Sequence, residues 1–332
     1  MTASTEIASS AINPQATHVV REWKHSAMLL SCRFDPSGRF VFGTSGDRSI
    51  QRWLVAGGDP TRFSGHMSWL RALGFSLDGT TTYSAGYDGK LMFWETASED
   101  PEPQRIVDAH QGWVRSLAVD PSGRSIATGG NDRLVKIWSV VDGKLIRELK
   151  GHESHIYSLA YHPSGQLLSG DLFGNVLHWN AETGERIRTI DAKDLHTFHG
   201  SHGNFGGVHS LALSTDGKYL TGTGLYEATN PNGGAQSPLA VQFQWDSGAK
   251  VRLHTAKKIG QCINYRGRYH TNGDLLCGLG KQLAFWRAEE AEPYHVIEFP
   301  SHVLDFDLHP DQLHVATAHF DGHLRLSKMQ AA

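Results

Sequence analysis

Apolar and polar residues are arranged along this chain in short runs of about four to seven residues, rich in Val, Ile, Leu, Tyr and Thr. Turn residues separate the runs, as in Asp35–Gly38, Asp120–Gly123 and His162–Gly165, each of which has Pro and Ser between its ends. Pro and Gly at such positions are typical of tight turns between strands. No stretch keeps the 3.6-residue period of an amphipathic helix, so the pattern predicts an all-β protein.

The same unit of strands and turns recurs along the chain. A tryptophan marks most units, and the steps between successive markers are 41, 44, 41, 66 and 41 residues, from Trp53 through Trp94, Trp138, Trp179 and Trp245 to Trp286. A further step of 41 residues leads to Ser327, in a similar strand that has lost the tryptophan. Such a period indicates a repeat architecture, and we predict seven units of four short strands.

Three units carry further shared residues, and these resemble WD40 repeats: Gly65-His66 with Asp88 and Trp94, His110 with Asp132 and Trp138, and Gly151-His152 with Trp179. The resemblance covers roughly residues 18–328. It implies a seven-bladed β-propeller over residues 18–329, in which each repeat is spread over two adjacent blades. Residues 1–17 are expected to form a disordered N-terminal tail.

The two ends of the repeat region predict how the ring closes. His18 to Trp23 is similar to the outer strand Leu145 to Lys150, but no blade precedes it. The last unit stops at Met329, directly after its third strand. We therefore expect the N-terminal strand to complete the last blade, which removes an open sheet edge.

The resemblance also assigns a structural role to a buried tetrad of His, Ser or Thr, Asp and Trp. Two units have a complete tetrad: His66, Ser84, Asp88 and Trp94, and His110, Thr128, Asp132 and Trp138. The fourth unit has His152, Ser169 and Trp179, with Phe173 at the turn position. The first unit has Gly43 in place of the hydroxyl, beside His25, Asp47 and Trp53, and the seventh keeps only Thr317 and Asp321. Because the set recurs at a fixed spacing, we interpret it as a hydrogen-bonded scaffold rather than a catalytic triad.

Residues that follow the repeat histidines form the candidate partner-binding site. Trp and Arg recur three and five residues after the histidine in two adjacent repeats, as Trp69 with Arg71 and Trp113 with Arg115. The equivalent or neighbouring positions of the other repeats add His155, Tyr157, Tyr87, Phe320, Met28 and His302. All are expected on the face of the propeller called the top. Trp, Tyr and Arg dominate binding hot spots, so we predict a protein or peptide partner on this face. Because Arg clamps carboxylates, an acidic partner segment is expected. The alternative is that these Trp pack between blades and these Arg pair with nearby carboxylates.

The fifth repeat is longer than the others, and its extra residues fall in two top-face insertions at about 191–207 and 225–238. The first insertion contains His196, His199 and His202, a residue type that binds zinc, copper and nickel. A metal-binding or enzymatic propeller that uses this insertion is therefore the alternative function. A further possibility is a subunit held in a larger complex by its blade edges.

Composition narrows the classes of function. The 31 basic and 34 acidic residues give a net charge of −3, which argues against nucleic-acid binding. The three cysteines, none in a CxxC, make a disulfide scaffold or thiolate zinc site improbable. No apolar run is long enough for a membrane helix and no signal peptide is recognisable. We predict a cytoplasmic, non-enzymatic interaction scaffold without a cofactor, either a monomer or a subunit of a complex.

Overall fold

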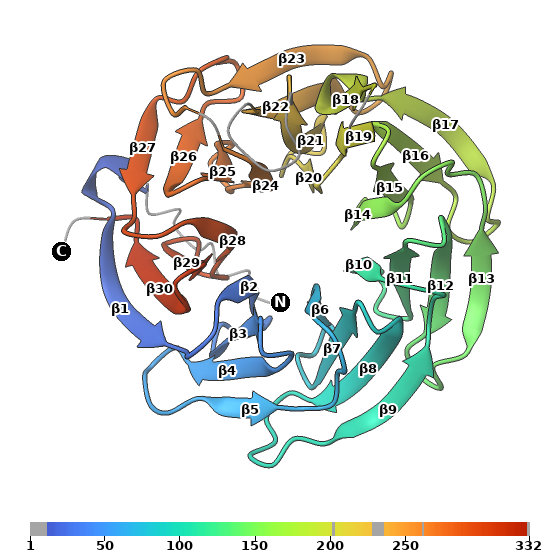
Figure 1. The fold of residues 1–332 in the computed structure, drawn as a ribbon, viewed down its shortest axis with the longest axis vertical. Coiled ribbons are helices and arrows are strands. Elements are labelled where there is room, and N and C mark those ends of the chain that lie inside the picture. Colours follow the sequence, from blue (N-terminus) through green and yellow to red (C-terminus); the bar gives the residue numbers. More distant parts are fainter. Residues whose placement is uncertain (1–11, 201–202, 228–235, 261, 331–332) are drawn as a thin grey trace, which may run out of the picture.

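A computed structural model describes residues 12–200, 203–227, 236–260 and 262–330 of the chain. Seven four-stranded antiparallel sheets stand as blades around a central axis, so the all-β fold and the seven-bladed propeller are confirmed (Figure 1). The first strand of each blade lies nearest the axis. The two described helical segments, η1 (Pro14–Ala16) and η2 (Lys193–Leu195), are single 3-10 turns, and neither is long or apolar enough to cross a membrane.

The strands of each blade are given from the inner strand outward. Blade 1 consists of β2 (Leu29–Phe34), β3 (Phe40–Ser45), β4 (Ile50–Leu54) and β5 (Thr61–Phe63), and blade 2 of β6 (Leu70–Phe75), β7 (Thr81–Gly86), β8 (Lys90–Glu95) and β9 (Pro103–Asp108). Blade 3 consists of β10 (Val114–Val119), β11 (Ser125–Gly130), β12 (Val135–Ser139) and β13 (Leu145–Leu149), and blade 4 of β14 (Ile156–Tyr161), β15 (Leu167–Asp171), β16 (Asn175–Trp179) and β17 (Arg186–Asp191). Blade 5 consists of β20 (Ser210–Leu213), β21 (Tyr219–Tyr226), β22 (Ser237–Gln244) and β23 (Lys250–Thr255), and blade 6 of β24 (Asn264–Tyr269), β25 (Leu275–Leu279), β26 (Gln282–Trp286) and β27 (His295–Glu298). Blade 7 consists of β28 (Val303–Leu308), β29 (His314–His319), β30 (His323–Lys328) and, as its outer strand, β1 (His18–Lys24).

The hydrophobic core lies between neighbouring blades. One cluster joins Phe42 of blade 1 to Trp94 of blade 2, and another joins Tyr83 of blade 2 to Trp138 of blade 3. Each of the seven blade interfaces has such a cluster of buried side chains. Short strands suffice because every blade buries both of its faces against others.

The N-terminal strand closes the ring as expected. Strand β1 pairs antiparallel with β30, and Trp23 is buried in the cluster between blades 7 and 1. The preceding residues also contact the last blade: the Asn13 backbone N–H donates to the Met329 carbonyl at 2.8 Å, and Pro14 is buried. Residues 12–17 of the expected disordered tail are thus in contact with blades 6 and 7, and residues 1–11 lie outside the described part.

One repeat marker was misassigned in the sequence. In the other blades that keep the tryptophan, it pairs with the first residues of the second strand, as in Leu167 opposite Trp179. In blade 5 the equivalent partner of Leu220 is Phe243. Phe243 fills the buried site, whereas Trp245 follows the strand and stacks on His162 of blade 4 at 4.2 Å between ring centroids. The prediction for Trp245 is wrong because a long insertion precedes it and hides the true spacing.

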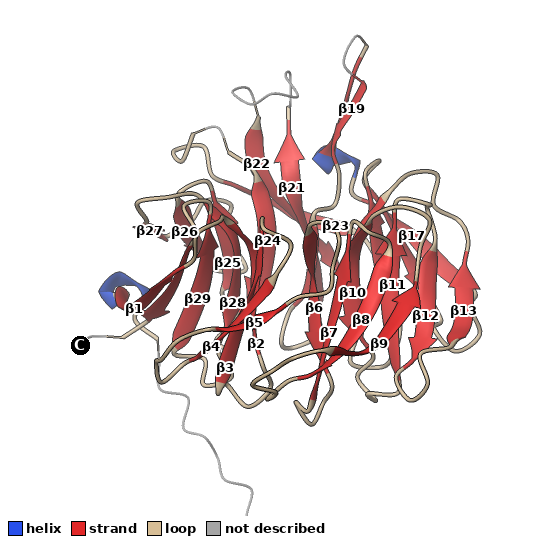
Figure 2. Cartoon of the chain, turned by 60° about the horizontal axis from the view of Figure 1, so that its bottom comes forward, coloured by secondary structure: helices blue, strands red, loops and turns tan. Residues whose placement is uncertain are grey.

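The two insertions of the fifth repeat lie on the same face. Residues of the first form η2 and a hairpin of β18 (His196–His199) and β19 (Gly203–Gly206), so they have regular structure. The second lengthens β21 and β22, which remain paired up to Tyr226 and Ser237. Figure 2 shows the hairpin and the ends of β21 and β22 rising beyond the other blades. His202 and residues 228–235 lie outside the described part.

The tetrads form continuous hydrogen-bond chains. In blade 2 the Trp94 Nε1–H donates to Ser84 Oγ at 2.7 Å, Ser84 bonds His66 Nε2 at 2.8 Å, and His66 Nδ1–H donates to Asp88 at 2.9 Å. Blade 3 has the same arrangement, from Trp138 through Thr128 and His110 to Asp132. All of these side chains are buried or nearly so, which explains why the polar groups must satisfy one another.

The fourth tetrad is complete, contrary to the sequence prediction. Asp171, at the end of β15, accepts the His152 Nδ1–H at 2.8 Å, and Ser169 joins His152 to Trp179. The repeat spacing indicated position 173, which is Phe173, but the carboxylate comes from Asp171, two residues earlier. In the first repeat His25 and Asp47 interact at 3.1 Å without the hydroxyl, and Trp53 packs on Gly43 instead.

Candidate partner-binding site

A ring of seven side chains surrounds the mouth of the central channel. In six blades the first strand has a β-bulge directly after its first residue, and a bulge re-aims the side chain of the extra residue. His209 precedes β20 at the corresponding place in blade 5. These seven residues all line a cavity of about 690 Å³ along the axis: Leu30, Arg71, Arg115, Tyr157, His209, Tyr265 and Leu304.

The two arginines of this ring have no carboxylate partner among the described residues. The Arg115 guanidinium lies between aromatic rings, with its central carbon 4.6 Å from the Tyr157 centroid and 4.9 Å from that of Trp113. Its Nε–H donates to Asn131 Oδ1 at 2.9 Å. Arg71 extends across the channel and lies 5.3 Å from the Tyr265 ring centroid. Cation–π contacts hold both charges in place without neutralising them.

Aromatic residues of blades 4 to 6 complete the mouth. His209 contacts the rings of Tyr157 and Tyr265 at 5.4 and 5.6 Å between centroids. Its Nε2–H donates to the Gly206 carbonyl at 3.1 Å. Burial lowers the pKa of His209 to about 4, and the charges of Arg71 and Arg115 act in the same direction. His209 is therefore neutral at pH 7, and the positive charge at the mouth belongs to the arginines.

The predicted Trp–Arg pairs lie side by side, next to the channel. Trp69 and Trp113 are 45% and 43% exposed, so neither is a core residue. Trp113 stacks on Tyr87 of blade 2 at 4.5 Å and 6° between planes, and the Trp69 Nε1–H donates to the Gly46 carbonyl at 2.9 Å. Trp69, Tyr87 and Trp113 line a second pocket of about 460 Å³ together with Met67 and Arg71. We call the four uncharged residues of this group (Met67, Trp69, Tyr87, Trp113) the aromatic shelf.

The remaining predicted residues are more dispersed. His155 is half-buried, and burial together with the charges of Arg115 and Arg133 lowers its pKa. Phe320 is 60% exposed in the top turn of blade 7, and its backbone N–H donates to the carbonyl of exposed His302. Met28 is half-buried against Gly46. None of these four lines the pocket beside the aromatic shelf.

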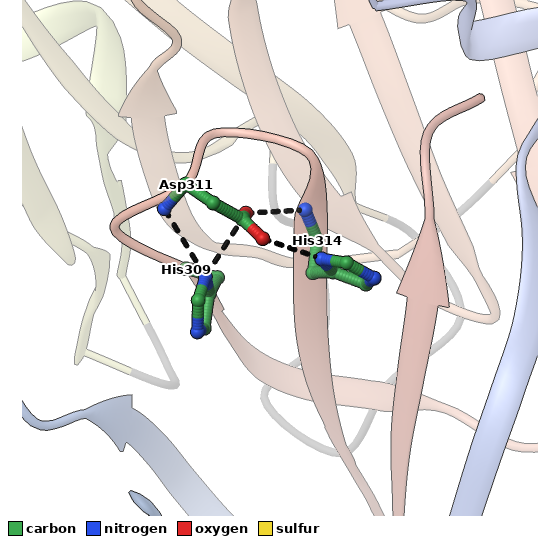
Figure 3. A group of neighbouring side chains, drawn as sticks. All are labelled: His309, Asp311 and His314. Atoms are coloured by element: carbon green, nitrogen blue, oxygen red, sulfur yellow. Dashed lines mark hydrogen bonds and ion pairs between the residues drawn. The ribbon is translucent and has the colours of Figure 1, made fainter. Parts of the chain in front are cut away.

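The two histidines of the first insertion that the structure describes do not converge. His196 and His199 are three residues apart on β18, so their side chains leave opposite faces of the hairpin. The His196 Nε2–H donates to Asn204 Oδ1 at 2.8 Å. A group of possible metal ligands within the described residues lies elsewhere, in the turn between β28 and β29, where His309, Asp311 and His314 meet (Figure 3).

Turn geometry accounts for that group. The Asp311 backbone N–H donates to His309 Nδ1 at 3.1 Å, and the equivalent bond, also at 3.1 Å, recurs at His162 and His270 in other blades. The His309 Nε2–H donates to Gly38 of the next blade at 2.9 Å. Since both imidazole nitrogens are used within the fold, His309 links blades rather than offering a lone pair to a metal.

Sequence reasoning missed the charged residues deeper in the channel. Arg33, Arg266, Arg268 and Asp305 line the cavity, and Asp307 pairs with Arg268. These positions hold Ser, Ala or Gly in blades 2 to 5. Comparing the inner strands with one another, position by position, would have found them.

The ring, the blades and the tetrads define a seven-bladed propeller with an open, aromatic and cationic channel mouth. Four segments match the WD domain, G-beta repeat family, at residues 17–54, 57–95, 101–139 and 143–180. Each segment contains the outer strand of one blade and the three inner strands of the next. The chain belongs to the WD40-repeat family.

Three known proteins illustrate the relatives of this chain, and each is less than 30% identical to it. Transcription initiation factor TFIID subunit 5 of Caenorhabditis elegans is 27% identical over 278 residues, which cover 80% of this chain and 40% of that protein. Nuclear distribution protein PAC1 of Arthroderma otae is 28% identical over 174 residues, covering 43% and 38%. Protein HIR1 of Cryptococcus neoformans var. neoformans serotype D is 29% identical over 168 residues, covering 44% and 19%. The chain thus spans less than half the length of each of these relatives.

Proposed function

We propose that this WD40 propeller is a non-enzymatic interaction scaffold that binds a segment of a partner protein on its top face. The observation that carries the proposal is the aromatic shelf, where half-exposed tryptophans of adjacent repeats flank a pocket beside Arg71. Large aromatic side chains provide contact area at a small cost in rotamer entropy. One relative is by name a subunit of a transcription initiation factor, which is consistent with a role within an assembly.

The charge around the shelf favours an acidic partner segment. Arg71 and Arg115 have no carboxylate partner among the described residues, and Arg48 lines the same pocket as Arg71. The nearby Asp88 and Asp132 are already bonded to His66 and His110. A chain with a net charge of −3 thus has a locally positive surface here, which would steer an acidic segment and pair with its carboxylates.

The His–Ser–Asp sets also support a scaffold rather than an enzyme. The side chains of His66 and Asp88 are 1% and 7% exposed, and Ser84 is fully buried, so a substrate cannot reach the hydroxyl. A catalytic triad requires an accessible nucleophile. The cytoplasmic location expected from the sequence stays a prediction.

The test begins with a peptide library selected on the full chain. We expect peptides enriched in Asp and Glu next to apolar residues. For a selected peptide, the double variant Trp69→Ala/Trp113→Ala should weaken binding by about thirtyfold or more, because a hot-spot truncation costs about 2 kcal/mol or more. The variant Arg71→Gln/Arg115→Gln should weaken binding and reduce its dependence on salt.

The matched control is Lys144→Ala/Lys150→Ala. Both lysines are exposed beside the outer strand β13, far from the channel mouth. Their substitution should therefore leave the dissociation constant of the peptide unchanged. Circular dichroism and melting temperature verify that each variant is folded. If the control loses the peptide while the top-face variants keep it, binding occurs at the blade edges and the proposal fails.

A further inference from the structure

Three consecutive blades carry charged residues where the other four carry small ones. The positions are one and three residues after the channel-mouth ring. They hold Arg266 and Arg268 in blade 6, Asp305 and Asp307 in blade 7, and Ser31 and Arg33 in blade 1. In blades 2 to 5 the same positions hold Ala72 and Gly74, Ser116 and Ala118, Ser158 and Ala160, and Ser210 and Ala212. The charges come together because blade 7 stands between blades 6 and 1 (Figure 1).

Two of the three arginines are paired. The Arg33 Nη1–H donates to Asp305 Oδ2 at 2.7 Å, and Arg268 Nη2 bonds Asp307 Oδ1. Asp307 Oδ2 also accepts the Phe34 backbone N–H at 3.0 Å. Both carboxylates therefore have their own cation, and these two pairs are balanced in charge.

Arg266 is the surplus cation. Its Nε lies 3.7 Å from Asp305 Oδ1, and this nitrogen is buried without a hydrogen bond. Among the described residues, none accepts a hydrogen bond from its terminal nitrogens. Burial, with the adjacent charges of Arg33 and Arg268, lowers the pKa of Arg266 to about 9, and the guanidinium is still charged at pH 7. Three arginines share two aspartates here, so one net positive charge remains, and a partly buried surplus charge is costly unless a counter-ion compensates it.

We propose that the central channel binds a small phosphate oxyanion, held by Arg266 with support from Arg33 and Arg268. A guanidinium presents donors in a fork that matches the oxygens of a phosphate. The cavity of about 690 Å³ is lined by five arginines and Asp305, and Arg71 and Arg115 stand at its mouth. The excess of positive charge on these low-dielectric walls attracts an anion into the channel. The cavity also has room for an organic group attached to the phosphate.

Calorimetric titration and melting of the full chain test this proposal. Inorganic phosphate is added to protein in chloride buffer at pH 7, against NaCl of equal ionic strength. We expect phosphate to raise the melting temperature and NaCl not to, because a ligand of the folded state stabilises it. Glycerol phosphate forms a second arm. Tighter binding of glycerol phosphate than of phosphate indicates a phosphorylated small molecule, and the reverse indicates free phosphate.

The variant Arg266→Gln should weaken phosphate binding at least tenfold. Because the two remaining ion pairs are balanced, it should melt at the same or a higher temperature than the parent in NaCl alone. Arg266→Lys, which keeps the charge but not the fork, provides a second variant and should also bind more weakly. The exposed bottom-turn variant Arg124→Gln should bind phosphate like the parent. Equal effects of phosphate and NaCl on the parent, or unchanged binding in both Arg266 variants, would overturn the proposal.

Discussion

Asp171 offers a sharp test of the tetrad scaffold, because no repeat spacing indicates it. Its carboxylate is fully buried and accepts two hydrogen bonds of 2.8 Å, from the His152 Nδ1–H and from the Asn175 backbone N–H. The substitution Asp171→Ala leaves unsatisfied the buried His152 donor and the part-buried backbone and side-chain donors of Asn175. Each unsatisfied buried group costs about 1–3 kcal/mol, so we expect a loss of about 4 kcal/mol in the free energy of unfolding.

The assay is thermal melting together with urea denaturation. For a domain of this size, 1 kcal/mol corresponds to about 2 °C, so Asp171→Ala should melt about 8 °C lower than the parent. Asp171→Asn keeps one acceptor oxygen but presents an NH2 group to the second donor, so it should lose about half as much. Asp142→Ala is the matched control, because Asp142 lies in an exposed turn, where its carboxylate pairs with the exposed Lys144 ammonium and accepts the Lys144 backbone N–H. It should stay within about 0.5 kcal/mol of the parent.

The reasoning would be refuted if Asp171→Ala and Asp142→Ala had the same melting temperature. That result would mean that His152 finds another partner or that the fourth tetrad adds no net stability. A loss for Asp171→Asn as large as that for Asp171→Ala would instead show that both carboxylate oxygens are required. The comparison therefore separates the loss of one acceptor from the loss of both.

Two further predictions concern closure and pH. Deletion of residues 1–24 should lower the melting temperature much more than deletion of residues 1–16, because only the former removes β1 and buried Trp23; similar melting temperatures would contradict closure by this strand. Burial lowers the pKa of His319 to about 4, so the unfolded chain binds this proton more readily between pH 6.5 and 4. Stability should therefore fall by about 3 kcal/mol through this group as the pH drops over that range. The urea midpoint of His319→Gln should fall less than that of the parent between pH 6.5 and 4. An equal fall in both proteins would contradict the assignment of this pH dependence to His319.

Features set by local pattern could be predicted from the sequence. The turns, the seven repeats and the closing strand follow from residue types and spacing that recur along the chain. The sequence also pointed to Trp69 and Trp113, which are half-exposed, and their role in binding stays a prediction. What the spacing could not give was a partner at a different distance. His152 meets Asp171 after 19 residues, whereas His66 meets Asp88 after 22, mainly because Asp171 is the last residue of β15 while Asp88 lies in the turn that follows β7.

Features that depend on ring closure were beyond a reading of single repeats. Arg33 and Asp305 are 272 residues apart, yet they form an ion pair because the last blade stands beside the first. Trp245 and Phe243 are both aromatic, and only the pairing of β21 with β22 shows which one enters the core. In each case the sequence holds the right residue types, but the three-dimensional register selects among them.

The division of polar residues around the ring gives a physical reason for the places where we propose binding. The three complete tetrads belong to blades 2, 3 and 4, which also supply Arg71, Arg115 and Tyr157 to the channel mouth. In blade 2 the tetrad anchors the segment that carries the shelf: Asp88 accepts the Met67 backbone N–H at 2.9 Å, and the Tyr87 backbone N–H donates to the Trp69 carbonyl at 2.7 Å. Side chains on such a fixed loop lose little freedom when a partner binds, so more of the contact energy is retained as affinity. Blades 6, 7 and 1 lack this complete hydrogen-bond chain and carry the charge network instead, so the proposed peptide site and the proposed anion site lie on opposite sides of one channel.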